Sequence, residues 1–497
     1  MIALAHTFSV CLTALALSLA CARVENAPAA HDANNAALPY NPEAIVLSAE
    51  ELTQDALNAT RRMDSSGRGA DGQLQKLPAQ EHMRRAAIYH ANRAFDEARA
   101  HWRAVIAYYP EDSNVPNAHF LVGRSLFQEK RYEEALPIFG WLGDNYAQTQ
   151  GGSEGFYYVA ATLLRLNRAG EAAARYAEYI DRYPKGERVE AAHLNIIDSL
   201  REAGRPDDAL PWIERTRARY RGQPADTNAL FARLRLDVAR KDWPSALRTG
   251  EELSRAALGR NVGTTQSEVA YLRAYVLEHS GQKEQASRVY QGIADGLGSY
   301  YGSRATARLE RMGGASKSAA AAREARVHAE AKRLAGDYPA PYREQILRAV
   351  KGRDVDPRLM LAIMRQESGF KPGAKSPAGA RGLMQFTPDV AAKYAPRVKL
   401  GKLSEEDLHR PEVSILLAGA YLDELAKMFP GLPEAVAASY NGGEDNVARW
   451  VRRAVHDDRG VFTSEIGFTE SKDYAMKVAA NLRAYTELYT DDLKPRR

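Results

Sequence analysis

LMLAIMRQESGF, the stretch from Leu359 to Phe370, is an apolar run that ends on a glutamate followed by a serine, a glycine and an aromatic residue. Asp356-Pro357 stands just before it. This pair is typical of a helix start, because aspartate caps free backbone N–H groups and proline is preset for the first helical turn. Gly369 can end the helix in the left-handed conformation that favours glycine. The stretch therefore predicts a helix that ends beside its glutamate.

The glutamate lies on the apolar face of this predicted helix. Met360, Ile363, Met364 and Glu367 follow one another at the spacing i, i+3, i+4 and i+7, which places all four on one face. A carboxyl among apolar side chains, at the negative end of a helix dipole, is expected to have a raised pKa. That is the property of a general acid for a glycosidic oxygen, although a glutamate at a helix end is by itself more often a solvated surface residue.

Two later segments combine glycine turns with polar and aromatic residues. SPAGARGLMQFTP, from Ser376, contains two glycines before an apolar run, which lets backbone approach a ligand closely. AASYNGGEDNVARW, from Ala437, sets Tyr440 and Asn441 before a Gly-Gly turn. A tyrosine ring can stack on a sugar, and the amide of asparagine can bond an acetamido group. Taken singly, each segment is equally well a turn, a helix cap or part of a core.

The order and spacing of five segments resemble one family, the lysozyme-like catalytic domain of soluble lytic transglycosylases, which is related to goose-type lysozymes. The matching segments are DPRLMLAIMRQESGF, SPAGARGLMQFTP, AGAYLDELAKMFP, AVAASYNGGEDNVARW and FTSEIGFTESKDYAMKV, within about residues 336–490. The resemblance implies an α-rich domain that cleaves the β-1,4 bond between N-acetylmuramic acid and N-acetylglucosamine in peptidoglycan and forms 1,6-anhydromuramic ends. No zinc-type His/Cys spacing and no phosphate-cradling glycine loop is apparent in the sequence, so no cofactor and no metal are expected.

The resemblance also implies roles for individual residues. Glu367 would be the catalytic acid and base. The residues expected to contact the sugar or to border the cleft are Ser376, Gln385, Tyr440, Asn441, Glu470 and Tyr474.

Two other functions remain open at this point. A hydrolytic muramidase on the same fold would need a second carboxylate, and Asp389, Glu465 and Glu470 are candidates that the fold could bring near Glu367. A non-catalytic adaptor, with tetratricopeptide-like repeats and a domain that only binds glycan, belongs to a different class. The presence of the Glu-Ser, Gly-Leu-Met-Gln and Tyr-Asn segments together argues against an adaptor, which would not need all three.

The middle of the chain repeats itself every 37 residues. Segments such as FDEARAHW and YEEALPIF place a small residue at the same position of each copy, namely at Ala98, Ala135, Ala172, Ala209 and Ala246. A sixth copy follows at Ala286, and a tyrosine column runs through Tyr109, Tyr146, Tyr183 and Tyr220. Small residues at fixed positions let paired helices approach closely and stack into a solenoid. The pattern resembles tetratricopeptide repeats, and its surface could hold a protein partner.

The N-terminus predicts export. Residues 1–22 are apolar and end in the small-x-small cleavage site Ala20-Cys21-Ala22. The overlapping segment LSLAC, which ends at Cys21, also resembles a lipobox. The product is thus expected in the periplasm, either soluble or attached to a membrane through lipidated Cys21; a spanning anchor is the less favoured reading. The other cysteine, Cys11, also lies in this segment.

The predicted organisation is mostly α, with a tetratricopeptide-like helical solenoid followed by an α-rich lysozyme-like catalytic domain. The predicted bounds are a signal peptide at 1–22, a flexible tether with one short helix at 23–80, repeats at 81–312, a linker or polar connecting helix at 313–335, and the catalytic domain at 336–497. The net charge of +5 over 497 residues suits an anionic polymer, and no nucleic-acid partner is expected.

Overall fold

The computed structural model describes residues 47–48, 51, 53–69, 72–376, 378–454 and 458–496. Throughout these residues the regular structure is helical, and strand pairing is limited to isolated bridges. The predicted mostly α fold is confirmed. The predicted signal peptide, Cys21 and the first part of the predicted tether lie outside the described residues.

Among the helices of the described residues, none is both long enough and apolar enough to span a membrane.

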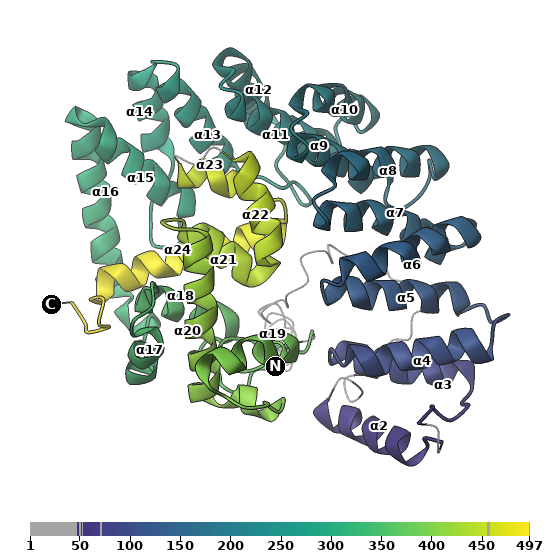
Figure 1. Cartoon of the computed structure of the whole chain (residues 1–497). Coiled ribbons are helices and arrows are strands. Elements are labelled where there is room, and N and C mark those ends of the chain that lie inside the picture. Colours follow the sequence, from purple (N-terminus) through teal and green to yellow (C-terminus); the bar gives the residue numbers. More distant parts are fainter. Residues whose placement is uncertain are drawn as a thin grey trace, which may run out of the picture.

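Antiparallel helix pairs make up residues 79–333 and form an arc around the C-terminal helices (Figure 1). The helices of the arc are α3 (Ala79–Ala91), α4 (Phe95–Tyr108), α5 (Val115–Gln128), α6 (Tyr132–Asn145), α7 (Gln150–Arg165), α8 (Ala169–Arg182), α9 (Val189–Glu202), α10 (Pro206–Arg219), α11 (Pro224–Ala239), α12 (Trp243–Arg255), α13 (Gln266–His279), α14 (Lys283–Gly292), α15 (Tyr300–Met312) and α16 (Gly314–Arg333).

The residue columns of the repeat are packing positions. The column alanines, from Ala98 to Ala286, lie in the second helix of each pair and are fully buried. At Gly155 of α7, an added Cβ would lie 3.0 Å from Leu142 and 3.1 Å from the Phe139 carbonyl oxygen, so only a small residue fits there. The tyrosine column links pairs: Tyr109 donates a hydrogen bond to a carbonyl of the preceding segment at 2.7 Å.

Part of the predicted flexible tether is folded. Helix α2 (Gln54–Ser66) docks on α3 and buries Leu57 completely. Its Asp64 accepts hydrogen bonds from Arg85 at 2.5 Å and from Tyr89 at 2.6 Å. A buried carboxylate with these donors fixes the helix to the first pair, so the short helix expected in this stretch, as a transient or a docked one, is docked on the helical array.

The segment predicted as a linker or polar connecting helix is the long helix α16, which packs on α15 and on the last helix of the chain. Val327 and Ala331 of α16 share a small core with Leu297 and Ala484. The two parts of the molecule are therefore joined here by packed side chains and not only by the chain.

The C-terminal helices enclose a separate apolar core. They are η1 (Ala335–Asp337), α17 (Arg343–Val350), α18 (Pro357–Ser368), α19 (Pro388–Tyr394), η2 (Ala395–Val398), η3 (Glu406–His409), α20 (Pro411–Met428), α21 (Pro433–Gly442), α22 (Glu444–Arg453), α23 (Arg459–Ser464) and α24 (Thr469–Leu488).

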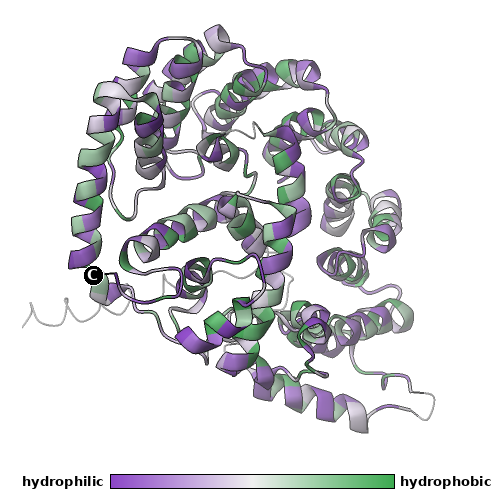
Figure 2. Ribbon diagram, turned by 60° about the vertical axis from the view of Figure 1, so that its left-hand side comes forward, coloured by the Kyte–Doolittle hydropathy of each residue, from purple (hydrophilic) through white to green (hydrophobic). Residues whose placement is uncertain are grey.

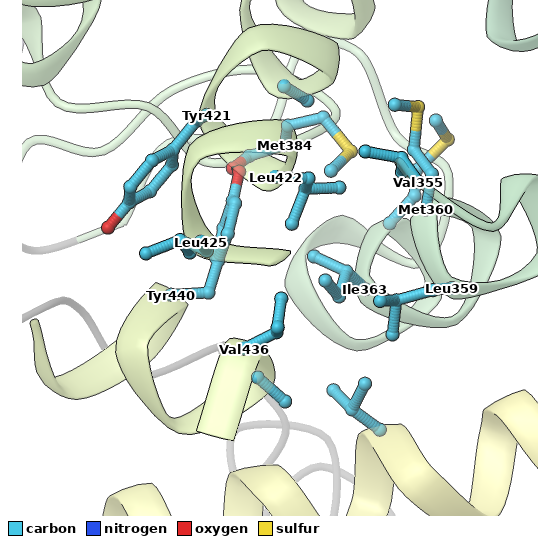
Figure 3. Packing of buried hydrophobic residues seen from close by; sticks show 14 of the residues in the cluster. Val355, Leu359, Met360, Ile363, Met384, Tyr421, Leu422, Leu425, Val436 and Tyr440 are labelled. Carbon is cyan, nitrogen blue, oxygen red and sulfur yellow. The ribbon is translucent and has the colours of Figure 1, made fainter. Parts of the chain in front are cut away.

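Helix α18 lies at the centre of this core, against α24 and α20. Figure 3 shows Leu359, Met360 and Ile363 of α18 facing Leu422 and Val436. Hydrophobic and hydrophilic residues alternate along single helices in both parts of the molecule, as Figure 2 shows. This alternation is expected where each helix buries one face. The core thus places the end of α18, with its glutamate, inside the domain.

Candidate active site

Helix α18 begins and ends as its sequence predicts. Asp356 accepts a hydrogen bond from the backbone N–H of Arg358 at 2.8 Å, and Pro357 occupies the first turn. At the other end Gly369 adopts the left-handed conformation, with φ of 55°. The carboxyl of Glu367 sits in the last turn, on the buried face of the helix, and the residue is 4% exposed.

Burial dominates the electrostatics of Glu367. The surrounding apolar side chains raise the pKa of its carboxyl to about 8, because a charged carboxylate is poorly solvated there. The Tyr474 hydroxyl opposes this shift by donating a hydrogen bond to Oε1 at 2.6 Å, and the negative charge of Glu470 adds to it. The expected raised pKa is confirmed. At neutral pH the carboxyl is protonated and can act as an acid.

Tyr440 and Asn441 lie at the end of α21, and Tyr440 is near this carboxyl. The Tyr440 hydroxyl donates to the carbonyl of Met384 at 2.8 Å, and its ring packs on that of Tyr421 with the centroids 5.2 Å apart (Figure 3). The charge of Glu367 raises the pKa of Tyr440 further, after burial, so the two side chains are near in space.

The amide of Asn441 is hydrogen-bonded within the protein. Its Nδ2 donates to Glu470 at 3.3 Å, and its Oδ1 accepts from Ser471 at 2.6 Å. The structure thus brings Glu367, Tyr474, Tyr440, Asn441 and Glu470 into one region. Glu470 interacts with both sides of this group, because it accepts a hydrogen bond from Asn441 and its negative charge raises the pKa of Glu367.

Ser376 and Gln385 lie in the loop between α18 and α19. Ser376 accepts a hydrogen bond from the backbone of Ala380 at 3.0 Å, so its hydroxyl shapes the loop. Gln385 donates from Nε2 to the carbonyl of Gly382 at 2.9 Å, whereas its Oε1 is buried and has no hydrogen-bond donor among the described residues. Within those residues neither side chain is hydrogen-bonded to Glu367. Their contact with sugar stays a prediction.

Sequence reasoning missed the residues that hold this loop against α18. Ser368, next to the glutamate, donates to the carbonyl of Leu383 at 2.8 Å, and Ser414 of α20 accepts from the N–H of Met384 at 3.1 Å. Gly382 has φ of 79°, and an added Cβ would lie 1.9 Å from the Leu408 carbonyl oxygen. The Glu-Ser and Gly-Leu-Met segments of the sequence mark some of these residues. The hydrogen-bond partners could not be predicted, because they are distant in sequence.

A hydrolytic mechanism would need a second carboxylate, and two of the three candidates for it form ion pairs with arginines. Asp389 forms a two-point ion pair with Arg93 of the helical array, at 2.9 and 3.0 Å. Glu465 contacts Arg201 at 2.5 Å and both Arg235 and Arg453 at 3.2 Å. Glu470 is the remaining candidate, and it is the one whose charge acts on Glu367.

A cavity of about 530 Å³ opens between the array and the C-terminal helices. Tyr440 and Asn441 contribute to one wall. Phe127, Lys130 and Arg165, from the array, contribute to the other. Its volume is in the usual range for ligand sites, and it adjoins the residues around the buried acid. No grouping of three or more His, Cys, Asp or Glu side chains suited to a metal ion occurs in the described part of the chain.

A buried carboxyl with a raised pKa, in a helical domain whose Tyr440 and Asn441 border a cavity, is the arrangement expected of a general acid. Residues 344–461 match the family model of the Transglycosylase SLT domain. The chain therefore carries a transglycosylase SLT domain, and the resemblance seen in its motifs is confirmed.

Curated relatives match over the same part of the chain. The soluble lytic murein transglycosylase of Escherichia coli K12 is 32% identical over 145 residues, which are 29% of this chain and 22% of the relative. Membrane-bound lytic murein transglycosylase C of Edwardsiella ictaluri is 37% identical over 117 residues, 22% of this chain and 33% of the relative. The chain thus spans a third or less of the length of these relatives.

Among solved structures, the 70 kDa soluble lytic transglycosylase of Escherichia coli aligns with a TM-score of 0.46 and 16% identity, over 89% of this chain and 86% of that one.

Proposed function

We propose that this chain is a lytic transglycosylase that cleaves the β-1,4 bond between N-acetylmuramic acid and N-acetylglucosamine in peptidoglycan. The observation that carries the proposal is the buried carboxyl of Glu367, with a pKa of about 8 and a hydrogen bond from Tyr474. The SLT domain and the names of the curated relatives support it.

In the first step Glu367 acts as a general acid. Its proton goes to the glycosidic oxygen, the bond from that oxygen to the anomeric carbon of the muramic acid breaks, and N-acetylglucosamine leaves with a free hydroxyl. Positive charge develops on the anomeric carbon and the ring oxygen. The carboxylate that remains is stabilised by the Tyr474 hydroxyl.

In the second step the same carboxylate acts as a base. The C6 hydroxyl of the muramic acid attacks its own anomeric carbon and gives its proton to Glu367, which closes a 1,6-anhydro ring. No water is consumed, and the proton that Glu367 lost is recovered. One carboxyl is sufficient for both steps because they need opposite protonation states in succession.

The surrounding side chains would position the sugar. Asn441 and Tyr440 line the cavity, and the unbonded Oε1 of Gln385 is an acceptor for an N–H or O–H of the ligand. Ser376 would act by holding the loop that carries Gln385. These roles remain proposals for each residue.

A hydrolytic muramidase is the second candidate, and Glu470 is the observation that keeps it open. This carboxylate is half-buried, accepts a hydrogen bond from Asn441 and influences the pKa of Glu367. It could activate a water molecule in place of the internal hydroxyl. The third candidate, an adaptor that only binds glycan, gives no reason for a carboxyl with a pKa of about 8.

Product analysis distinguishes the three candidates. Purified sacculi digested with the full chain are expected to release muropeptides with anhydro ends, each lighter by one water than the hydrolytic product. Reducing ends in the bulk of the digest would assign a muramidase. Binding to sacculi without release of fragments would assign an adaptor.

The proposed place of action is the periplasm, where the polymer is found. The chain would be either soluble or held at a membrane through lipidated Cys21. Fractionation of cells that express the wild type or Cys21→Ser separates these forms: membrane association lost in the variant indicates lipidation, and identical soluble fractions contradict it.

A further inference from the structure

Among the described residues, one cation in the wall of the 530 Å³ cavity, Arg165, forms no ion pair. Arg165 ends α7 of the helical array and is partly buried. Its guanidinium lies over the ring of Phe127 at 5.6 Å and over that of Phe468, from the C-terminal domain, at 5.7 Å. Among the described residues no carboxylate pairs with it. The two rings attract the cation but occupy none of its N–H donors.

The other charges in this cavity are already matched. Lys130 pairs with Glu444 at 2.9 Å and with Asp445 at 3.1 Å. Asp389 is held by Arg93. Glu129 also lines the cavity, and its carboxylate is bound by Arg99 at 2.5 Å, a residue behind the wall. Arg165 is therefore the cation of this cavity that forms no direct ion pair with the described residues, although the charge of Glu202 acts on it from beyond contact distance.

An unpaired guanidinium in a partly buried cavity is costly unless a ligand supplies an anion. Burial lowers the pKa of Arg165 to about 10, helped by the charge of Arg449, yet the group is still positive at neutral pH. Its planar donors match a carboxylate at two points, which is the geometry that arginine prefers.

We infer that Arg165 binds a carboxylate of the peptide stem carried by the glycan strand, and so selects stem-bearing peptidoglycan. The inference rests on the proposed function, which supplies a polymer whose muramic acid bears an acidic peptide. The cavity that Arg165 faces is bordered by Asn441 and by Tyr440, and Tyr440 lies close enough to Glu367 for the charge of that carboxyl to act on it. A sugar at Glu367 would thus project its peptide toward the helical array.

The array then has a role in substrate choice. The catalytic domain supplies the acid, and the cavity wall supplied by α5 to α7 reads the charge of the peptide. Phe468 contributes from the opposite side, so the site is complete only when both parts of the chain are present.

The test compares two soluble substrates of equal size with the full chain. One is a glycan–peptide fragment with free stem carboxylates, and the other is the same fragment with these groups converted to methylamides. The wild type is expected to show about tenfold higher kcat/KM on the free acid, the effect of one charge-assisted hydrogen-bonded pair. Equal rates on both substrates would overturn the inference and leave the proposed function standing.

Three variants assign the preference to the residue. Arg165→Gln should lose it, and Arg165→Lys, which keeps the charge but not the planar donors, should retain part of it. Arg168→Gln is the matched control, because Arg168 is an exposed arginine just beyond α7 that pairs with Glu171; it should keep the full preference. Retention of the preference in a folded Arg165→Gln would contradict the assignment.

Binding separates this inference from the catalytic one. The full chain carrying Glu367→Gln, which cannot use its acid, is titrated with both fragments by calorimetry. Tighter binding of the free acid, lost on adding Arg165→Gln, supports the inference even if the wild type cleaves neither substrate. Equal affinity for both fragments contradicts it.

Discussion

Glu367 at the end of α18 and Glu465 at the end of α23 are buried to nearly the same degree, at 4% and 2% exposed. Their surroundings are opposite. Glu367 has apolar neighbours and one tyrosine hydroxyl, and burial raises the pKa of its carboxyl to about 8. Burial would also raise the pKa of Glu465, but three guanidiniums outweigh it and hold the pKa below its usual value.

This difference separates chemistry from structure. A buried carboxyl that keeps its proton can give it to a substrate. A buried carboxylate surrounded by Arg201, Arg235 and Arg453 is fixed in its charged state and can only hold the structure together. Arg201 and Arg235 belong to the helical array, so Glu465 fastens the C-terminal domain to it. The comparison teaches that burial alone does not single out a candidate general acid, and that the lack of a neighbouring cation is needed as well.

The largest effect is expected from removing the acid. Glu367→Gln keeps the shape of the side chain and should lower the rate of muropeptide release by about 10² to 10⁴. The melting temperature should stay equal or rise, since the amide is neutral in both states whereas the Glu367 carboxyl must take up a proton on folding at neutral pH. Activity near that of the wild type in this variant would show that another group donates the proton.

Glu465→Gln should have the opposite pattern. Removing the anion leaves three buried arginines facing one another without it, and breaking a buried pair costs about 3–5 kcal/mol of stability. Urea unfolding should detect this loss, while the rate per folded molecule on soluble glycan falls much less than in Glu367→Gln. Glu171→Gln, at an exposed pair, is the control and should leave the melting temperature unchanged. A Glu465→Gln chain as stable as the wild type would contradict the structural role assigned to Glu465.

The catalytic helix was predictable because its signals are local. The cap at Asp356, the apolar stripe and the glycine after Ser368 lie within fifteen residues, and the repeat columns follow from helix packing at a fixed spacing. The pairing of Arg201 with Glu465 was not predictable, since 264 residues separate the partners. Nothing in either segment distinguishes an arginine of the interface from one of the surface. The same holds for Arg165 and Phe468, which meet only after the array has closed on the domain.

The pH dependence should follow the protonation of Glu367. The acid form is required, so kcat/KM should fall about tenfold per pH unit above pH ~8. Tyr474→Phe removes a hydrogen bond that lowers the pKa, so it should move this limb to higher pH. Glu470→Gln removes a negative charge that raises the pKa, so it should move the limb to lower pH. Shifts in the same direction for both variants would contradict the assignment of the limb to Glu367.

Stability should respond to pH with opposite signs at the two carboxyls. The folded pKa of Glu367 lies above its unfolded value, so the folded state binds more protons between the two and loses stability as pH rises toward about 8. The folded pKa of Glu465 is lowered, so its contribution is present above the unfolded value and disappears as pH falls through the folded pKa. Urea unfolding of Glu367→Gln against the wild type should therefore show a difference that grows from pH 5 to pH 8. A constant difference would mean that Glu367 titrates normally in the folded chain.

The smallest effect is expected at the other end of the interface, where the first helix pair meets the domain through Arg93 and Asp389. The geometry is good, with two contacts at 2.9 and 3.0 Å, but the Asp389 side chain is 40% exposed, so water and salt screen the pair. Exposed ion pairs contribute about 0.2–1 kcal/mol, and Arg93→Gln should therefore lower stability by less than about 1 kcal/mol, with a loss that shrinks as salt is added. Glu465→Gln, whose partners are buried, should depend on salt much less. If Arg93→Gln cost as much as Glu465→Gln, the array would be held equally along its whole length. A small, salt-sensitive loss instead makes the buried arginine cluster around Glu465 a stronger fastening between the array and the domain than the Arg93–Asp389 pair.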